Sequence, residues 1–532
     1  MRRRLWLALM GMVVWTGVWP ALASAQYYNT FGRNKVQYSS FDWQVMQTEH
    51  IDLYYYPEER ALAEIAAASA EQSYRVLESR FSLSIHRRIP LILYSAHQYF
   101  EETNTIPEFL PESVGAFTEF LKGRVVIPHL GSYYEFDKVL RHELVHVFTI
   151  EKIKSVYMTH HRPLTVGPPL WFMEGLAEHW SEGWSAEADM IIRDAVLSGY
   201  LVGLPQINAI YGTFLMYKEG ESFLKFLAER YGDEVIELMF ENWWRGRSFE
   251  EIVRISTGKS LNALSEEWTY DLRKQYYPLL ARTDLPDRAA RPLTTRGLNI
   301  KPACVPAAAD STEDAGLVFL STREGYEDLC WAPLNETEQH VQLLVRGGRS
   351  PKFESFHFLR SKMAVNRNWQ VAFVSQSEAQ DVLYVWNLKT RALERRFRFD
   401  DLVGLSSPSW SPDGRRIVFS GLSQGGQSDL YLVDSDSGRL MKLTNDLYED
   451  RDPAWSPDGR WLAFTSDRAD GGDQAGWTNL FMIDPDTGQV EGLTQGRHND
   501  TAPAWSPDGR WLAFTSDRDT GIDVYLMDAA RR

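Results

Sequence analysis

The sequence contains little cysteine, no excess of positive charge and no long apolar run after its first 25 residues. Two cysteines among 532 residues exclude a disulfide scaffold, and neither belongs to a Cys-x-x-Cys metal pair. The 56 lysines and arginines face 72 aspartates and glutamates, so the formal net charge is −16. This balance argues against a nucleic-acid partner, because such binding depends on cationic side chains. No segment after residue 25 is long and apolar enough to cross a bilayer.

The composition that remains is typical of a folded globular protein. Hydrophobic residues make up 44% of the chain, aromatic residues 13% and charged residues 24%. Because 532 residues are too many for a single hydrophobic core, the length predicts two or three domains.

The first 25 residues have the pattern of a secretory signal peptide. Three arginines at positions 2–4 precede an apolar run over 5–18, and Ala23-Ser24-Ala25 offers the small residues that a signal peptidase needs. We therefore expect cleavage before Gln26 and a periplasmic or secreted protein without stable membrane insertion after cleavage. An uncleaved anchor is the alternative. Lipoprotein attachment is excluded, because no cysteine follows the run.

The character of the sequence changes near residue 285. From 26 to 285 the hydrophobic periodicity is mostly helical, and a polar, Pro- and Arg-rich stretch over 282–296 is the expected linker. The predicted helices span 58–81, 136–153, 222–230, 233–243 and 261–276, and the predicted short strands span 89–94 and 124–127.

From 286 to 532 the sequence repeats. The motif Trp-Ser-Pro-Asp-Gly-Arg begins at residues 410, 455 and 505, and two degenerate copies precede it. At intervals of roughly 50 residues each unit carries an aligned phenylalanine; these are Phe319, Phe373, Phe419, Phe464 and Phe514. Pro-Asp-Gly favours a hairpin turn, so each unit is predicted to be one blade of a β-propeller. Scattered hairpins without ring closure are the alternative.

The Trp-Ser-Pro-Asp-Gly and Ser-Asp-Arg units closely resemble TolB-type β-propeller repeats. Five units are visible, whereas the family more often has six blades. The last unit ends at residue 528 without a fourth strand of its own. Pro292-Leu293-Thr294 resembles the missing strand, so we expect it to complete the last blade and close the ring.

The candidate chemistry lies in the first domain, in His142-Glu143-Leu144-Val145-His146. Histidines four residues apart project from one face of a helix, so both can reach one zinc ion at about 2.1 Å. Glu143 lies beside them, where it can act as a general base. A bare motif of this kind also arises by chance, and two ordinary, partly buried histidines are the alternative.

The downstream segment Trp171-Phe-Met-Glu-Gly-Leu-Ala-Glu-His-Trp180 adds a second motif. With it, the domain resembles the gluzincin, or peptidase MA-like, zinc metallopeptidases. The resemblance implies an α+β zincin-like fold, the metal ligands His142, His146 and Glu174, and Glu143 as the general base. Glu178 would orient a ligating histidine. The alternative that Glu178 rather than Glu174 is the ligand stays open.

Several other residues could contribute to such a site. His160, His161 and His179 are expected to be surface or packing residues rather than extra ligands. Tyr217 could polarise a reaction intermediate, although packing is the favoured interpretation. Residues 114–120 resemble the strand on which such enzymes bind substrate, but Glu119 is one residue late and should turn to the other face.

Together these features predict a secreted or periplasmic metallopeptidase with one Zn²⁺ ion and a polypeptide substrate, and a propeller that binds substrate or an envelope protein. The alternatives are a binding or scaffold protein with an inactive metal domain, and a zinc hydrolase that acts on another bond.

The two cysteines are expected to be free, as small apolar residues inside the blade, in spite of an oxidising compartment. Alignment of the first repeat with the others places Cys304 on the first strand of its blade and Cys330 on the third. Two inter-strand spacings are about 9.5 Å, whereas a disulfide needs Cα atoms within about 7 Å.

Overall fold

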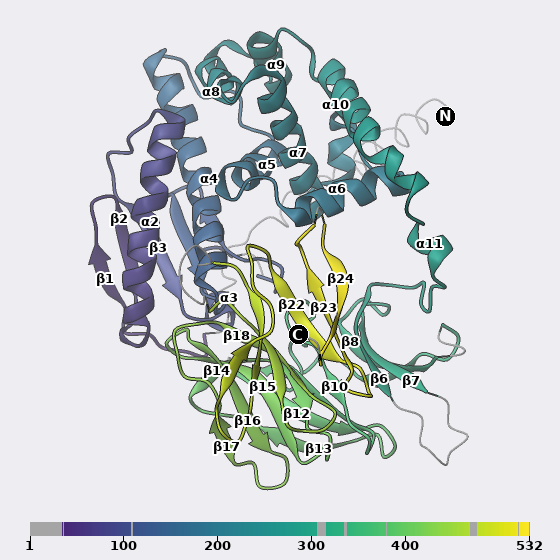
Figure 1. The fold of residues 1–532 in the computed structure, drawn as a ribbon. Helices are drawn as coiled ribbons and strands as arrows, with labels where there is room; N and C mark the ends of the chain where they lie inside the picture. Colours follow the sequence, from purple (N-terminus) through teal and green to yellow (C-terminus); the bar gives the residue numbers. More distant parts are fainter. Residues whose placement is uncertain are drawn as a thin grey trace, which may run out of the picture.

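The fold is described from a computed structural model. It covers residues 35–530 apart from 36, 108–109, 306–314, 335–337, 379, 469–475 and 520. The predicted signal peptide lies outside the described residues. Figure 1 shows a helical N-terminal region lying on a β-propeller, with the chain passing between them at one edge of the molecule.

A five-stranded sheet forms one side of the N-terminal region. Its order is β1-β2-β3-β5-β4, with parallel pairing of β2 with β3 and of β3 with β5. The antiparallel edge strands are β1 and β4. The strands are β1 (Gln44–Gln47), β2 (Ile51–Tyr55), β3 (Ile89–Tyr94), β4 (Phe117–Glu119) and β5 (Arg124–Pro128). The two strands predicted from sequence, β3 and β5, are confirmed.

Helices make up most of the rest of this region. They are α2 (Arg60–Phe81), α3 (His97–Glu101), α4 (Tyr133–Thr159), α5 (Leu170–Ser181), α6 (Ala186–Ser198), α7 (Phe214–Tyr231), α8 (Glu234–Glu241), α9 (Phe249–Thr257), α10 (Leu261–Tyr276) and α11 (Pro286–Ala289), with 3₁₀ turns at Pro57–Glu59, Leu204–Ile210, Trp243–Arg245 and Tyr277–Ala281. All the predicted helices are confirmed. α4 is longer than predicted, and its N-terminus is capped by Ser132, which accepts the N–H of Glu135. In the part of the chain that the structure covers, none is long and apolar enough to cross a membrane.

An aromatic core joins the helices to one another. Phe81 of α2 packs against Phe148 of α4 and Phe240 of α8, with ring centroids 5.5 and 5.4 Å apart. Phe172 of α5 lies 5.7 Å from the fully buried Trp243. Large aromatic side chains bury much apolar area, so these contacts hold α4 and α5 in a defined relation.

The C-terminal half is a five-bladed propeller. Four sheets have four strands in sequential order, and the last has three. The first blade contains β6 (Asn299–Val305), β7 (Gly316–Ser321), β8 (Asp328–Pro333) and β9 (Gln342–Val345), and the second contains β10 (Ala364–Val365), β11 (Gln370–Ser377), β12 (Gln380–Asn387) and β13 (Ala392–Phe397). The third contains β14 (Leu402–Trp410), β15 (Arg416–Ser423), β16 (Ser428–Asp434) and β17 (Leu440–Lys442), and the fourth contains β18 (Asp450–Trp455), β19 (Leu462–Ser466), β20 (Asn479–Ile483) and β21 (Val490–Gly492). The fifth contains β22 (Asp500–Trp505), β23 (Trp511–Ser516) and β24 (Asp523–Asp528). Each aligned phenylalanine lies on the second strand of its blade, as the repeat predicted.

The repeated motif works as a self-contained turn between the first two strands. In the fourth blade Ser456 Oγ donates to Asp458 and accepts the N–H of Trp461, 2.9 Å away. Gly459 adopts a positive φ of 74°, which favours glycine. The same bonds recur around Asp413 and Asp508. The motif therefore encodes the hairpin locally, which is why it could be recognised in the sequence.

The strand expected to close the ring is not formed, and that prediction is wrong. Residues 292–294 lie outside any strand, and the last sheet has only β22, β23 and β24 among the described residues. The following Thr295 donates its N–H to Glu338 of the first blade at 2.8 Å. That bond holds the segment beside the first blade instead of the last.

The inner end of the propeller and the N-terminal region enclose a cavity of about 650 Å³. Five structurally equivalent inner positions contribute to it: Lys301, Lys362, Ser407, Asp452 and Ala502. At the same junction the buried Asp381 accepts hydrogen bonds from Gln98 of α3 (2.8 Å) and from the backbone of Leu405 (2.8 Å). The two regions are thus joined by buried polar contacts.

We expect the two thiols to differ in reactivity. Cys330 on β8 is 1% exposed, as expected, but Cys304 on β6 is exposed, so the prediction that it lies inside the blade is wrong. Strand β7 lies between them. Burial raises the pKa of Cys330 to about 11. Iodoacetamide at pH 8 should label Cys304 in the folded protein and Cys330 only after unfolding, as read by mass spectrometry. A Cys304–Cys330 crosslink in unreduced protein would contradict this strand order.

Candidate metal centre

His142 and His146 lie on one face of α4, as their spacing predicts. Their ring centroids are 4.9 Å apart, and both side chains are largely buried. The rings point toward α5, where Glu174 faces both. Glu174 Oε2 lies 3.4 Å from His142 Nε2 and 3.4 Å from His146 Nε2. The structure therefore brings together all three residues that the two sequence motifs nominated.

This geometry fits a metal ion of the zinc type. Ligand atoms bonded at about 2.1 Å to a tetrahedral ion are about 3.4 Å apart, which is the separation seen here. Two imidazoles and one carboxylate are a usual donor set for zinc. In the described part of the chain, two other groups bring three possible ligand atoms within 4.8 Å of one another, and one of them, Glu49, His50 and Glu71, already has internal hydrogen bonds. The other is the acidic cluster of Asp429, Asp446 and Asp450.

The charges of the three residues are strongly coupled. Burial acts to lower the pKa of His142, but the hydrogen bond with Glu174 and the charges of Glu143 and Glu178 raise it to about 9. Burial likewise opposes ionisation of Glu174, yet His146 and His142 bring its pKa down to about 2. The site therefore favours a carboxylate beside a positive charge, which a metal ion can also supply.

Glu143 is buried next to these ligands and is held by β4. Thr118 Oγ1 donates to Glu143 Oε2 at 2.7 Å. Glu119, the next residue, turns away, as predicted from strand alternation: it binds Arg124 and the backbone N–H of Leu121. The sequence did not predict a role for Thr118, because that role arises only from the packing of strand β4 against helix α4.

Glu178 lies one turn after Glu174 on α5 and is linked to α7. Its Oε1 is 3.5 Å from His142 Nδ1, and its Oε2 accepts a 2.5 Å hydrogen bond from Lys218 Nζ. Lys218 also donates to the buried Glu221 at 3.2 Å. These contacts form a connected series of charged side chains, the charge series, which runs from Glu221 through Lys218 and Glu178 to His142. Lys218 and Glu221 carry no recognisable motif, so the sequence did not reveal them.

The charge series can form because helices α5 and α7 cross with their backbones in contact. A methyl group on Gly175 would lie 2.6 Å from the backbone nitrogen of Glu221, and one on Gly220 would overlap the carbonyl oxygen of Trp171. Any larger residue would force the helices apart. Gly175, directly after Glu174, therefore sets the distance between the two helices.

Tyr217, also on α7, is close to the candidate centre. Burial raises its pKa, and the charges of Glu174, Glu143 and Glu178 raise it further. Tyr217 packs against the hydrophobic core of the N-terminal region, which is the role that sequence reasoning favoured. The other histidines lie elsewhere, as predicted: His160 stacks on Trp244 at 4.1 Å, His161 is exposed, and His179 lies near Arg80.

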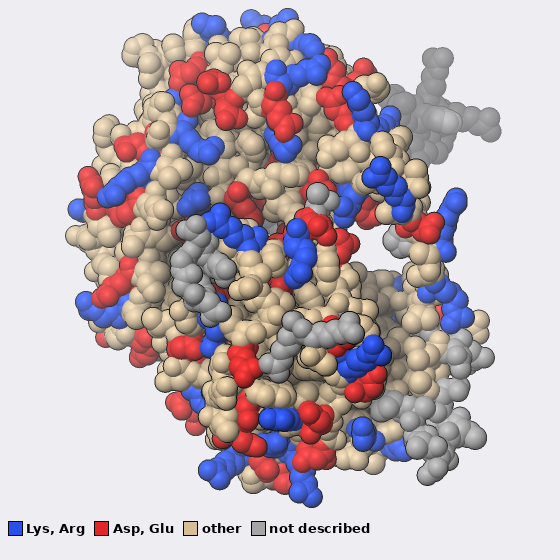
Figure 2. Space-filling model, in the orientation of Figure 1, with Lys and Arg blue, Asp and Glu red and all other residues tan. Residues whose placement is uncertain are grey.

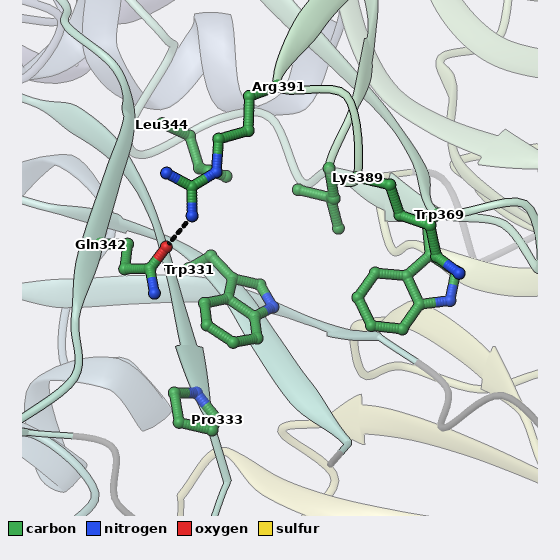
Figure 3. A pocket seen from close by; sticks show the side chains of 8 residues that line it. Trp331, Pro333, Gln342, Leu344, Trp369, Lys389 and Arg391 are labelled. Atoms are coloured by element: carbon green, nitrogen blue, oxygen red, sulfur yellow. Dashed lines mark hydrogen bonds between the residues drawn. The ribbon is translucent and has the colours of Figure 1, made fainter. Parts of the chain in front are cut away.

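A separate cavity of about 470 Å³ lies in the propeller, between the first two blades (Figure 3). Trp331 and Trp369 flank it, and Arg391 donates to Gln342 across one side. Lys389 lies over the Trp369 ring at 4.8 Å. None of the candidate metal ligands lines it.

Comparison with known proteins finds one family match within the C-terminal half. Residues 362–475 match the family model of the TolB beta propeller domain. The matched residues span the second and third blades and the first two strands of the fourth, so this part of the propeller is similar to the TolB beta propeller domain. The match covers less than half of the chain.

Several solved structures are similar to part of this chain at low sequence identity. The TolB protein of Agrobacterium tumefaciens is 23% identical, covering 44% of this chain and 78% of its own, with a TM-score of 0.35. The TolB protein of Acinetobacter baumannii is 18% identical, covering 43% and 66%, with a TM-score of 0.30. An oligogalacturonate lyase of Vibrio parahaemolyticus is 13% identical, covering 44% and 72%, with a TM-score of 0.31.

We expect Lys218→Met to destabilise the protein by about 3 kcal/mol at pH 8, because two buried carboxylates lose their cation. Burial already raises the pKa of Glu221 from 4.5 to about 7, and the charge of Lys218 opposes that rise. Without the lysine the pKa rises further. The folded variant then binds more protons than the unfolded chain above pH 4.5, so its stability falls as pH increases.

The measurement is urea unfolding at pH 5.5 and pH 8, and the loss should be larger at pH 8. Lys225→Met is the matched control on the same helix, since Lys225 pairs with an exposed Glu229; it should change stability by less than about 0.5 kcal/mol. Equal losses of unfolding free energy for the two variants would contradict a stabilising role for the charge series.

Proposed function

We propose that this chain is a zinc-dependent metallopeptidase that hydrolyses polypeptides outside the cytoplasm. The observation that carries the proposal is the convergence of His142, His146 and Glu174 with the buried Glu143 beside them. A general base next to three metal ligands suits hydrolysis, whereas a purely structural zinc site has no use for it. Similarity to gluzincin peptidases in both sequence motifs supports the same class.

In this proposal His142, His146 and Glu174 hold one Zn²⁺ ion, which would acidify a water molecule and polarise the scissile carbonyl group. Glu178 accepts the Nδ1 proton of His142 and so presents Nε2 to the metal. Lys218 neutralises Glu178 and keeps it in place.

Glu143 performs the proton transfers. Thr118 engages Oε2, so Oε1 is the oxygen that takes a proton from the attacking water and returns it to the leaving amine. The phenol of Tyr217, kept neutral by its raised pKa, can donate a hydrogen bond to negative charge that develops on the substrate oxygen.

The propeller is placed to control access or to bind a partner. Tyr134, near the start of α4, contacts Trp477 of the fourth blade, with ring centroids 6.2 Å apart. His142 follows Tyr134 by about 12 Å along the same helix.

Figure 2 shows acidic and basic side chains intermixed over one face, without a broad basic patch of the kind that nucleic acids bind. We propose a protein partner in the periplasm or outside the cell.

Glu143→Gln should retain zinc and the melting temperature of the wild type but lower the cleavage of casein or a peptide library by at least 10³-fold, because the base is lost. Glu119→Gln, on the adjacent strand but turned away, is the matched control and should stay within threefold. Activity of Glu143→Gln within tenfold of wild type would refute the mechanism. A wild-type protein that binds zinc but cleaves neither substrate would favour a binding or scaffold protein.

Glu174→Ala and Glu178→Ala should show which glutamate binds the metal and which one only orients His142. Chelator competition followed by metal analysis should show that Glu174→Ala abolishes tight zinc binding, because a ligand is gone. Glu178→Ala should weaken binding by only about 10–100-fold, since it orients His142 without contacting the metal. The reverse order would mean that the two roles are exchanged.

A further inference from the structure

The cavity of about 650 Å³ at the junction of the two regions lies against the face of α4 that carries the candidate metal ligands. Glu135 and Val139 line the cavity, and His142 and His146 follow Val139 after three and seven residues. Residues at these spacings lie on one face of a helix. Val139 precedes His142 by about 4.5 Å along the helix axis. The cavity therefore reaches within one helical turn of the metal centre.

The propeller side of this cavity is formed by strained backbone. In four of the five blades, the first strand has a β-bulge at the cavity. The bulged residues Lys301, Ser407, Asp452 and Ala502 all line the cavity, and each has a positive φ between 52° and 55°. Left-handed backbone is unfavourable for residues other than glycine, and bulges often redirect a side chain at a functional site. The bulges thus present these side chains to the cavity.

Most charged side chains of the cavity have a partner of opposite sign. The ion pairs are His357–Asp381 (2.6 Å), Arg360–Glu112 (3.9 Å), Arg451–Glu449 (3.8 Å) and Glu135–Lys138 (3.2 Å). Two lysines differ from the rest. Among the described residues, Lys301 and Lys362 form no ion pair, and Lys362 Nζ donates a 3.4 Å hydrogen bond to the backbone oxygen of Asp452.

One carboxylate, that of Asp452, compensates both lysines from a distance. Ser407 Oγ donates to Asp452 Oδ1 at 2.7 Å and holds it in place. Burial lowers the pKa of Lys362, and the charge of Lys301 lowers it further, whereas Asp452 opposes both effects. Because two buried ammonium groups share one carboxylate, a second carboxylate in the cavity would stabilise both.

Two further side chains of the cavity have a buried polar atom that lacks a partner. Ser420 and Glu449 are 3% and 5% exposed. Among the described residues, Ser420 Oγ and Glu449 Oε2 have no hydrogen-bond partner. Buried polar atoms are nearly always paired, so these two atoms point to a polar ligand. A peptide offers both N–H donors and carbonyl acceptors.

We propose that this cavity binds a carboxylate of a peptide substrate through Lys301 and Lys362, with the rest of the peptide extended along α4 toward the metal centre. This inference rests on the proposed peptidase function. The carboxylate is the C-terminal one or that of an aspartate or glutamate side chain. An anchored carboxylate fixes the position of the scissile bond, so cleavage falls at a constant distance from it in peptides of different lengths.

The probe is an N-terminally labelled octapeptide, Gly-Ala-Ala-Leu-Phe-Ala-Ala-Ala, with a free C-terminal carboxylate or a C-terminal amide. A third form ends in Asp with a C-terminal amide. Fluorescence anisotropy with the full-length Glu143→Gln chain measures binding without cleavage, and the free acid should bind at least tenfold tighter than the plain amide. If the Asp form also binds tightly, the site accepts side-chain carboxylates; if only the free acid does, it selects the C-terminus. Equal affinity of all three forms would overturn the proposal.

Lys301→Met and Lys362→Met, made in the same Glu143→Gln chain, test the two lysines. Each should reduce the preference for the free acid to less than threefold without changing the melting temperature, whereas Lys362→Arg should retain it. Lys352→Met is the matched control, since Lys352 is an exposed propeller lysine outside the cavity, and its affinity should stay within twofold. A tenfold preference that survives both methionine variants would refute the role of the lysines.

Cleavage by the wild type distinguishes this inference from the proposed function. Mass spectrometry of the products should show one constant distance between the cut and the carboxylate in peptides of different lengths. Lys362→Met should raise KM for the free acid at least tenfold and change kcat by less than threefold. Cleavage at variable distances with equal KM for acid and amide would overturn the carboxylate site and leave the peptidase standing. Carboxylate-dependent binding without cleavage would support the site and refute the peptidase.

Discussion

The candidate centre depends on the close crossing of α5 and α7 at Gly175 and Gly220. Because neither residue has a side chain, the two backbones touch, and Lys218 reaches Glu178 from the neighbouring helix. Glu178 then lies beside His142, while Glu174 on the same helix faces both histidines. A larger residue at the crossing would move both glutamates away from α4 together. One steric constraint thus positions the ligand and its support.

Buried charge at the centre is tolerated only because it is arranged in a connected series. Glu221, Lys218, Glu178, His142 and Glu174 alternate in sign from one end to the other when His142 is protonated or a cation is bound. Removing a member leaves a buried charge without a partner, which costs more free energy than the pair contributes. This arrangement ties the shape of the N-terminal region to the chemistry of its centre.

The propeller is stabilised in a different way: each blade is held first by hydrogen bonds within itself and then by apolar packing against its neighbours. The Ser-Pro-Asp-Gly turn forms its hydrogen bonds within six residues. Arginines such as Arg468 bind an aspartate of the first strand, Asp450, through two oxygens, and lie over the Phe464 ring. The last blade has the same internal bonds, through Arg518 and Asp500.

Features encoded by short-range patterns could be predicted from sequence. The helix that carries His142 and His146, the Glu174 motif, the repeat and the strand order around the cysteines all depend on spacing within one segment. Thr118 and Lys218 could not be found this way, because each acquires its role from a partner 25 or 40 residues away on a packed element. Glu221 gains its role only through Lys218 on the same helix. The fourth strand of the last blade was mispredicted for the same reason. A Leu-Thr pattern shows that a segment can pair as a strand, but the path of the chain after α11 decides where that segment lies.

The sequence by itself determined the two-region organisation, the propeller repeat and the shared helix face of His142 and His146, because helix and strand periodicity are local properties. Only the tertiary structure decided that Glu174 rather than Glu178 faces both histidines, that Lys218 supports Glu178 and that Thr118 holds Glu143. Those outcomes depend on which elements pack together, and packing is set by the shape and volume of side chains distant in sequence.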